Sequence, residues 1–308
     1  MKIFTTNTRN KNRDSIWGLL FVAIPVLSVI FFVFLPALFS IYISMIEWNG
    51  YIPIGQATFV GLKNFAAFLS SGGLYSKEFL NALFVTITLM LYIPFNIVIS
   101  FLLAFVLNRK ATHMKNSLRL IYFLPFVSSA VAITLVFKNL FDVNGVINSL
   151  FAVFGFGNVE WLRSPGLSRI VIITMLIWRN IGYTMLMYLA GLQAVPNEIY
   201  EAAKIDGAGI IKQITKITLP SLKNITFFLI VTNVISGFQI YTESAILFQN
   251  SFGKGPLNGT ESIMVFLMYI YSGNDLGMAS AISWAITVLI LFATFLQFMR
   301  KRKEEKYD

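Results

Sequence analysis

The chain has 308 residues, of which 56% are hydrophobic and only 12% are charged, and its mean hydropathy is +0.72. This balance excludes an ordinary soluble domain and is typical of a protein that lies largely in lipid. Cysteine is absent, which excludes a disulfide framework, a thiolate metal site and a cysteine nucleophile. The net charge of +10 fits either nucleic-acid binding or basic loops on the cytoplasmic side of a membrane, and its distribution decides between them.

Six apolar runs are long enough to cross a hydrocarbon core, which takes about 20 residues of helix. The predicted spans are 16–46, 79–108, 120–137, 170–194 (interrupted by Arg179), 224–242 and 276–299. The sequence therefore predicts an all-α fold, a polytopic membrane helical bundle with about six transmembrane helices. Its transmembrane domain is expected to cover 16–299, between an N-terminal arm at 1–15 and a tail at 300–308.

The first run is much longer than the 7–15 apolar residues of a signal peptide, so we expect it to be retained as a helix. Prolines lie inside three of the predicted spans, where neighbouring helices can satisfy the freed carbonyl groups. We expect kinks rather than breaks at these positions, which are Pro25, Pro36, Pro94 and Pro125.

The basic residues divide unequally between the two sides of the predicted bundle. Seventeen share the side of the chain ends: Lys2, Arg9, Lys11, Arg13, Arg109, Lys110, Lys115, Arg119, Lys204, Lys212, Lys216, Lys223, Arg300, Lys301, Arg302, Lys303 and Lys306. Six lie on the other side: Lys63, Lys77, Lys138, Arg163, Arg169 and Lys254. Cytoplasmic loops carry the excess of Lys and Arg, so both termini and the connection at 194–223 are expected to be cytoplasmic. The basic excess needs no nucleic acid.

One apolar stretch on the outer side, 262–271, is too short to cross the membrane. We expect it to form a re-entrant or interfacial segment.

The connection between the fourth and fifth spans predicts two short helices joined by a turn. Glu198 and Glu201 favour a helix that opens near Pro196, because acidic residues stabilise a helix N-terminus. Gly207 can end this helix by adopting a positive φ. A second helix is expected over 210–218.

Pro220 is expected to mark the turn back into the membrane. The small side chains of Ala202, Ala203 and Ala208 would let another protein pack closely on this connection. An ordinary amphipathic helix resting on lipid headgroups is the alternative that physics alone leaves open.

The residues of this connection follow a spaced pattern: EAA, three residues, G, nine residues, I, one residue, LP. Seven positions carry it: Glu201, Ala202, Ala203, Gly207, Ile217, Leu219 and Pro220. The pattern resembles the motif of permease subunits of binding-protein-dependent ATP-binding-cassette importers, at the same place in the topology. The resemblance implies that these residues, together with Asp206 beside Gly207, couple the chain to an ATPase.

Further segments resemble the carbohydrate-uptake branch of that family, of the maltose and glycerol-phosphate permease type. They are VGLKNF (60–65), FLPFVSS (123–129), GVIN (145–148), YLAGLQAVP (188–196) and DGA (206–208). The family's outer-loop GGP appears here only as Gly255 and Pro256, with Lys254 in place of the other glycine.

The phosphate-cradling pattern G-x-x-x-x-G-K-[S/T] is absent from the chain. The one Gly-Lys pair, Gly253 and Lys254, has Phe248 where the first glycine belongs. The only histidine, His113, has no catalytic or metal-binding partners in the sequence pattern. We therefore expect a transport subunit that is not an enzyme, with ATP hydrolysis on a separate subunit.

A secondary, ion-coupled transporter is the main alternative. Such proteins usually place Asp or Glu inside their spans as proton relays or ion ligands. No predicted span interior carries a carboxylate, and Glu243 lies only at the outer end of the fifth. A purely structural membrane protein would explain the spans but not the pattern from Glu201 to Pro220.

Polar groups inside the fourth and fifth spans are candidates for the solute path, because polar groups in a span usually face the bundle interior. They are Arg179, Asn180, Tyr183, Asn233, Ser236, Gln239 and Tyr241. Aromatic faces beside amides and hydroxyls suit a neutral sugar. Arg179 can instead bind an acidic sugar, pair with Glu243 or bond to backbone carbonyls, and each other residue can equally serve a bond between helices.

The resemblance also implies an assembly in a bacterial or archaeal cell (inner) membrane, in contact with lipid. Its expected parts are a second permease in a heterodimer, cytoplasmic ATPase subunits and an extracellular solute-binding protein that delivers a sugar or oligosaccharide. ATP and Mg would bind the ATPase, and no cofactor or metal is expected in this chain.

Overall fold

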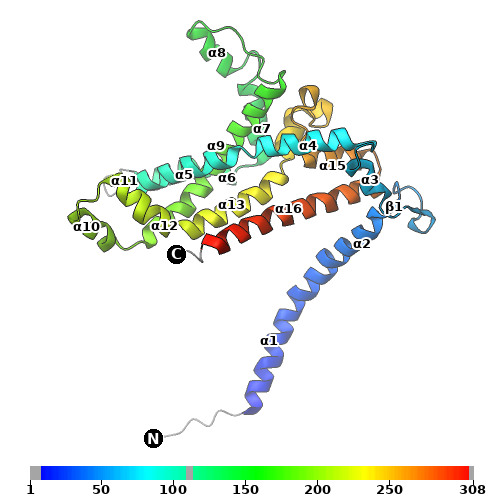
Figure 1. The fold of residues 1–308 in the computed structure, drawn as a ribbon, viewed down its shortest axis with the longest axis horizontal. Helices are drawn as coiled ribbons and strands as arrows, with labels where there is room; N and C mark the ends of the chain where they lie inside the picture. Colours follow the sequence, from blue (N-terminus) through cyan, green and yellow to red (C-terminus); the bar gives the residue numbers. More distant parts are fainter. Residues whose placement is uncertain (1–7, 109–113, 305–308) are drawn as a thin grey trace.

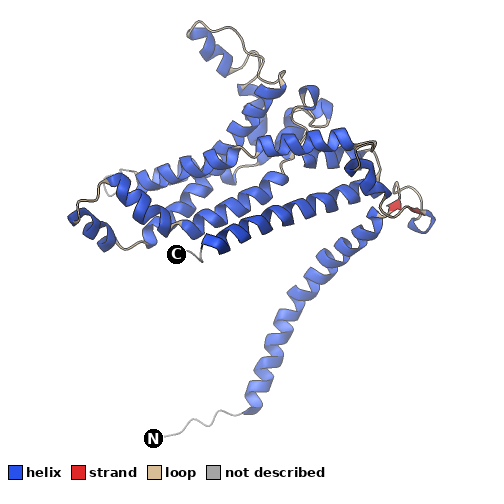
Figure 2. Cartoon of the chain, viewed as in Figure 1, coloured by secondary structure: helices blue, strands red, loops and turns tan. Residues whose placement is uncertain are grey.

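The computed structural model describes residues 8–108 and 114–304, and helices make up most of this part of the chain (Figures 1 and 2). The first half contains α1 (Thr8–Val29), a π-helical turn (Ile30–Phe34), α2 (Leu35–Ser44), α3 (Lys63–Leu69), α4 (Ser76–Leu89), α5 (Tyr92–Asn108), α6 (Lys115–Val127), α7 (Ala130–Leu140) and α8 (Val146–Val153). The second half contains α9 (Pro165–Ala194), α10 (Asn197–Ile205), α11 (Ile210–Gln213), a second π-helical turn (Ile214–Thr218), α12 (Leu219–Ser221), α13 (Lys223–Phe238), α14 (Thr242–Leu247), α15 (Ile263–Ser272) and α16 (Leu276–Glu304). Short 3₁₀ turns lie at Ile54–Gln56, Gln249–Ser251 and Pro256–Asn258.

Two short strands, β1 (Ile46–Glu47) and β2 (Thr58–Phe59), form an antiparallel pair beside the end of α2 (Figure 2). Met45 supports this corner, since its carbonyl accepts the backbone N–H groups of Val60 and Gly61. The predicted all-α class is confirmed.

Four apolar helical segments in the described part of the chain are long enough to cross a bilayer. They are Trp17–Ser44, Ser76–Asn108, Pro165–Ala194 and Leu276–Lys303. Two further segments are helix pairs bent at a break, so the described residues contain up to six spans if each pair counts as one. The prediction of about six spans agrees with this arrangement.

The third predicted span is not one continuous helix. α6 and α7 meet at 97°, and the break falls at Ser128 and Ser129, which have extended ψ angles of 153° and 129°. The Ser128 hydroxyl donates a hydrogen bond to the Leu124 carbonyl. Such side-chain bonds to the backbone compete with the regular hydrogen bonds of a helix. Charge-free length alone cannot reveal such a bend.

The fifth predicted span is also shorter than expected. α13 ends at Phe238, and Gln239 and Tyr241 lie in the connection to α14 rather than inside a helix. The Ser262 hydroxyl donates to the Ile240 carbonyl, so the free carbonyl at this break is satisfied from the loop before α15.

None of the four prolines ends the helix that contains it. Pro36 follows the π-helical turn, and its missing N–H falls in the first turn of α2. Pro94 lies in the first turn of α5, just after the break at Met90 and Leu91. Pro25 and Pro125 lie inside α1 and α6.

The bundle is built around the long helix α9. α5 and α6 pack along α9, α13 lies beside it, and α16 packs against α13, α15 and α2 (Figure 1). Three buried apolar clusters fill the spaces between these helices: one around Phe68 and Phe266, one around Met175, and one around Tyr188 and Leu229. Shape complementarity between spans, rather than hydrophobic transfer, holds such a bundle together in lipid.

The first span leaves the bundle as a long arm (Figure 1). The apolar window of Trp17–Ser44 is 0% buried within the chain, whereas that of Pro165–Ala194 is 39% buried. α1 begins at Thr8, so residues 8–15 of the predicted N-terminal arm are already helical. α16 likewise continues to Glu304, through most of the predicted tail. Residues 1–7 and 305–308, and the predicted loop residues Arg109, Lys110 and His113, lie outside the described residues.

Gly182 permits the close crossing of α6 and α9, because an added Cβ would overlap the backbone carbonyl of Tyr122. We expect Gly182→Ala to force these helices apart and to lower the stability of the folded protein by about 1–3 kcal/mol. Thermal unfolding of the purified protein in detergent measures the change. Gly166→Ala is the matched control on the same helix, since no atom lies within 4 Å of its added Cβ. Equal melting temperatures for the two variants would contradict the proposed contact.

Candidate functional site

A polar cavity of about 510 Å³ lies inside the bundle, between α5, the α6–α7 bend, α9 and the end of α13. Its walls combine ring faces, amides, hydroxyls and one ion pair. They are formed by Tyr92, Phe126, Ala130, Leu176, Arg179, Asn180, Tyr183, Thr184, Thr232, Asn233, Ser236, Gln239, Ile240, Thr242 and Glu243.

Breaks in the helices create this cavity. Tyr92 opens α5 after the break that ends α4, Phe126 and Ala130 flank the bend between α6 and α7, and Gln239 follows the last residue of α13. Interrupted helices at membrane depth are tolerated where they line a cavity, because their freed backbone groups need polar surroundings.

The strongest charges in the cavity form a pair. Arg179 Nη1 lies 2.7 Å from Glu243 Oε1, and the exposed fractions of the two side chains are 28% and 7%. The Nε atom of Arg179 is buried and has no hydrogen-bond partner among the described residues. The pair cancels its own net charge, so the cavity presents a polar wall without a net ionic charge from these two groups.

Neutral groups complete the wall around this pair. The Tyr92 hydroxyl donates to Asn233 Oδ1 at 3.2 Å, and Asn233 Nδ2 donates to the Leu229 carbonyl at 2.7 Å. The rings of Phe126 and Tyr183 stack with centroids 4.8 Å apart and planes at 15°. Stacked rings beside fixed amides and hydroxyls provide a surface that can hold both the apolar face and the hydroxyl groups of a saccharide.

The structure brings six of the seven predicted path residues to this one cavity. They are Arg179, Asn180, Tyr183, Asn233, Ser236 and Gln239. Sequence reasoning missed Tyr92, Thr184 and Thr232, which are also polar residues of apolar segments and carried the same signal. The sequence predicted Glu243 only at the outer end of a span, whereas the structure buries Glu243 in the wall of this cavity.

Tyr241 is the exception among the predicted path residues. It lines a separate cavity of about 280 Å³. Phe252 from the loop before α15 and Tyr269 on α15 line the same cavity. The connection at Tyr241 is not helical (φ −138°, ψ −55°), so its side chain does not follow the periodicity of α13.

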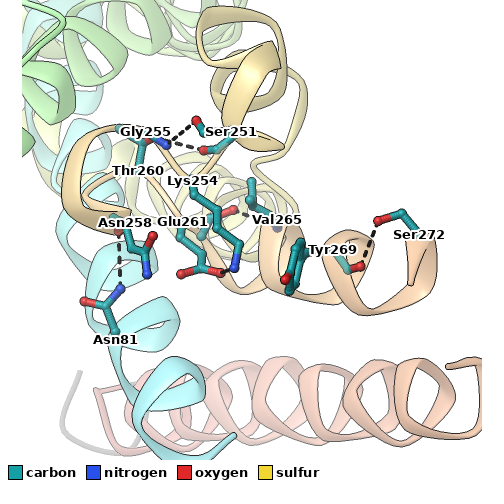
Figure 3. Close-up of polar contacts among 12 residues, drawn as sticks. Asn81, Ser251, Lys254, Gly255, Asn258, Thr260, Glu261, Val265, Tyr269 and Ser272 are labelled. Atoms are coloured by element: carbon teal, nitrogen blue, oxygen red, sulfur yellow. Dashed lines mark hydrogen bonds and ion pairs between the residues drawn. The ribbon is translucent and has the colours of Figure 1, made fainter. Parts of the chain in front are cut away.

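An ion pair holds the loop beside this smaller cavity. Lys254 Nζ lies 3.1 Å from the fully buried carboxylate of Glu261 and 3.4 Å from the centroid of the Tyr269 ring (Figure 3). Burial raises the pKa of the Glu261 carboxyl, and the contact with Lys254 opposes that rise. Asn81 Nδ2 on α4 donates to the Asn258 carbonyl and ties the same loop to the bundle.

The segment that carries the spaced pattern, residues 197–221, lies at the end of the bundle where α16 also ends (Figure 1). α10 opens at Asn197, directly after Pro196, as predicted. Gly207 has φ +73° and makes the predicted turn, after which a continuous helical stretch runs from Ile210 to Ser221. We call residues 197–221 the α10–α12 segment.

Hydrogen bonds fix the two arms of the α10–α12 segment to each other and support the turn between them. The Tyr200 and Thr218 hydroxyls lie 3.1 Å apart, and Gln213 Nε2 donates to the Ala208 carbonyl at 2.7 Å. Thr218 and Leu222 are fully buried, so the segment is anchored to the bundle at its second arm.

The predicted turn at Pro220 is wrong by two residues. The chain bends by 65° at Leu222, whereas Pro220 lies within the first turn of α12. Proline is accepted there because the π-helical turn directly before it alters the hydrogen-bonding register of the helix.

The α10–α12 segment presents the pattern residues at the surface. Glu201, Ala202, Asp206, Gly207, Leu219 and Pro220 are exposed, and Ala203 and Ile217 are half-buried. Two large apolar side chains of the same segment are also exposed: Ile205 is 86% exposed and Ile211 is 75% exposed. Exposed apolar side chains gathered on one surface are a common feature of interaction sites.

Among residues 8–108 and 114–304, no group of three or more His, Cys, Asp or Glu side chains could hold a metal ion.

Residues 64–304, more than half of the chain, match the family model described as "binding-protein-dependent transport system inner membrane component". Two curated relatives match over nearly their whole length. The arabinooligosaccharides transport system permease protein AraP of Bacillus subtilis (strain 168) is 32% identical, over 90% of this chain and 86% of the relative. The lactose transport system permease protein LacF of Rhizobium radiobacter is 30% identical, over 98% of this chain and 99% of the relative.

A solved structure is similar in fold. It is a bacterial alginate ABC transporter in complex with an alginate pentasaccharide-bound periplasmic protein, and its matching chain superposes with a TM-score of 0.80. The two chains are 22% identical, and the match covers 96% of each.

Proposed function

Since the chain belongs to the family of binding-protein-dependent transport system inner membrane components, we propose that its polar cavity carries a saccharide across the cell membrane, driven by ATP hydrolysis on a separate subunit. The chain is a permease subunit of an ABC importer, and this membership leaves the ion-coupled alternative without support. The cavity lined by Arg179, Asn180, Tyr183 and Asn233 is the observation that carries the saccharide proposal.

The composition of the cavity supports a neutral saccharide in particular. Arg179 is paired with Glu243, so it is not a free cation for a sugar carboxylate. The remaining wall offers hydroxyls, amides and the stacked rings of Phe126 and Tyr183. The relatives that transport arabinooligosaccharides and lactose support the same substrate class.

The α10–α12 segment is the proposed contact with the ATPase. A rigid two-armed segment with exposed apolar side chains can transmit motion from a bound subunit to α9 and α13, which it joins. ATP and Mg would then bind the partner. A second permease subunit, as a heterodimer, and an extracellular solute-binding protein complete the proposed assembly in the cell membrane.

The orientation follows from the distribution of basic residues, and we propose that the α10–α12 segment and both termini are cytoplasmic. Single cysteines introduced at Lys212 and Lys63 in this cysteine-free chain are expected to react with an impermeant reagent from opposite sides of the membrane. Both positions are exposed, and α11 and α3, which carry them, lie at opposite ends of the bundle (Figure 1). Labelling of both from one side would refute the six-span topology.

The cavity residues provide the test of transport. Alanine at Asn180, Tyr183, Asn233 or Gln239 is expected to weaken uptake about fivefold each, because each substitution removes about one polar contact worth roughly 1 kcal/mol. Uptake of labelled saccharide by cells at limiting concentration measures the effect, with the amount of assembled complex as a second readout. Thr88→Ala, which removes an exposed helix hydroxyl outside the cavity, is the control. Uptake at the parent level in all four variants would exclude this cavity as the path.

A further inference from the structure

A second cavity, of about 640 Å³, lies between the α10–α12 segment, α13 and the last turns of α16. It shares no lining residue with the polar cavity described above. Its walls are formed by Thr215, Leu219, Pro220, Lys223, Thr226, Phe227, Ile230, Gln297, Arg300 and Lys301.

The charges and the apolar groups of this second cavity are separated along the helices. Phe227 and Ile230 follow Lys223 by one and two turns into α13, and Gln297 precedes Arg300 by one turn of α16. The basic side chains therefore lie at one end of the cavity and the apolar ones extend away from them. None of its described lining residues is acidic.

Aromatic contacts give this cavity a fixed wall. The rings of Phe227 on α13 and Phe298 on α16 meet edge to face, with centroids 5.0 Å apart. Lys301 Nζ lies 4.7 Å from the centroid of the Phe227 ring. These contacts hold the ends of α13 and α16 together beside the basic rim.

The two helices that form this cavity also carry exposed apolar side chains that do not line it. On α16, Phe295 is 60% exposed and Phe298 is 52% exposed, and on α13, Phe228 is 45% exposed. In a membrane-spanning helix such a surface faces lipid or another span. The predicted orientation places the basic rim at the cytoplasmic headgroup level, where anionic lipids and a negative surface potential occur.

We propose that this cavity binds an anionic phospholipid of the cytoplasmic leaflet. The phosphate lies against Arg300, with Lys223 and Lys301 adding positive charge, and an acyl chain lies along Phe227 and Ile230. Basic pockets between spans on the cytoplasmic side suit such headgroups, and the apolar length beside the charges distinguishes a lipid from a free phosphate ion. The inference rests on the proposed function only for the orientation of the bundle.

The position of the lipid gives it a second role. Thr215, Leu219 and Pro220 belong to the α10–α12 segment, so one bound lipid joins that segment to α16. A ligand that binds the packed arrangement stabilises it in proportion to its occupancy. Anionic lipid is therefore expected to support the coupling of ATP hydrolysis to uptake.

Lipid retention by the intact purified complex tests the site independently of transport. The complex is exposed to dioleoylphosphatidylglycerol or dioleoylphosphatidylcholine, and bound lipid is counted by native mass spectrometry. We expect phosphatidylglycerol to be preferred. The double variant Arg300→Gln and Lys301→Gln is expected to weaken that binding at least about tenfold, since each basic residue near an anionic headgroup contributes roughly 1 kcal/mol.

The matched control removes the same charge from the same helix at Arg302→Gln and Lys303→Gln, which do not line the cavity. Ile230→Trp fills the apolar end without changing charge, and it is expected to weaken retention as well. Equal retention of the two lipids, or an equal loss in the lining and control variants, would overturn the proposal. So would a photoreactive group at Ile230 that labels the second permease subunit in place of lipid.

Discussion

Gly207→Val is expected to abolish ATP-driven uptake while the chain still inserts in the membrane. Gly207 has φ +73°, a conformation that a β-branched residue adopts only with strain of about 1–3 kcal/mol. No atom lies within 4 Å of an added Cβ at this position, so the damage comes from the backbone and not from a clash within the chain. The turn between α10 and α11 would open, and the exposed surface of the segment would lose its shape.

Gly209 provides the matched control for this variant. It lies two residues further along, has φ −63°, and also leaves open space around an added Cβ. Gly209→Val is therefore expected to keep at least half of the parent uptake. Co-purification of the ATPase and ATP hydrolysis in reconstituted vesicles measure the coupling in both variants. Normal ATPase binding, hydrolysis and uptake in Gly207→Val would remove the α10–α12 segment as the coupling element.

Charge reversal on the same surface is expected to act without changing the backbone. Glu201 is exposed on α10, and Glu201→Lys alters only the surface that a partner would meet. The same two assays should show reduced ATPase association, because an unfavourable charge at an interface lowers affinity.

Glu243→Ala is expected to reduce uptake by more than tenfold and to lower the yield of assembled complex. Glu243 is 7% exposed and accepts from Arg179 at 2.7 Å, so its removal leaves a largely buried guanidinium without its counter-charge. Breaking a buried ion pair from one side costs about 3–5 kcal/mol, and the partial exposure of Arg179 favours the lower end of that range.

The double variant Arg179→Gln and Glu243→Gln separates charge from shape at this pair. It removes both charges together, so we expect it to recover assembly that Glu243→Ala loses. Glu243→Gln alone leaves Arg179 positive, and acidic saccharides should then compete with uptake more strongly than they do in the parent. Equal uptake, assembly and competition in all of these variants would show that the pair does not shape the path.

The sequence predicts the spans well because lipid imposes a simple rule on length and charge. The runs at 79–108, 170–194 and 276–299 each lie within one of the long apolar helical segments. The conformation of Gly207 and the start of α10 after Pro196 were also predicted, since glycine and acidic residues act locally on the backbone.

The breaks were not predictable in the same way. The bend at Ser128 and the end of α13 at Phe238 depend on which distant groups satisfy the freed carbonyls, such as Ser262 at Ile240. These breaks create the polar cavity, so Phe126 of α6, an apolar side chain among many, could not be assigned to its wall from a single span.

The structure gives the one charged residue inside a predicted span a specific partner. The sequence left an acidic sugar, Glu243 and backbone carbonyls open as partners of Arg179, and the structure pairs it with Glu243 because α14 turns back against the bundle. The break after α13 makes that return possible.

The most direct test of ATP-driven saccharide import is uptake of labelled saccharide into vesicles that contain the purified complete assembly and its binding protein. Arabinooligosaccharides and lactose are the first probes, given the relatives of the chain. We expect accumulation that requires ATP and persists when ionophores collapse the proton and sodium gradients. Accumulation that follows an ion gradient without ATP, or that continues when the ATPase subunit is left out, would contradict it.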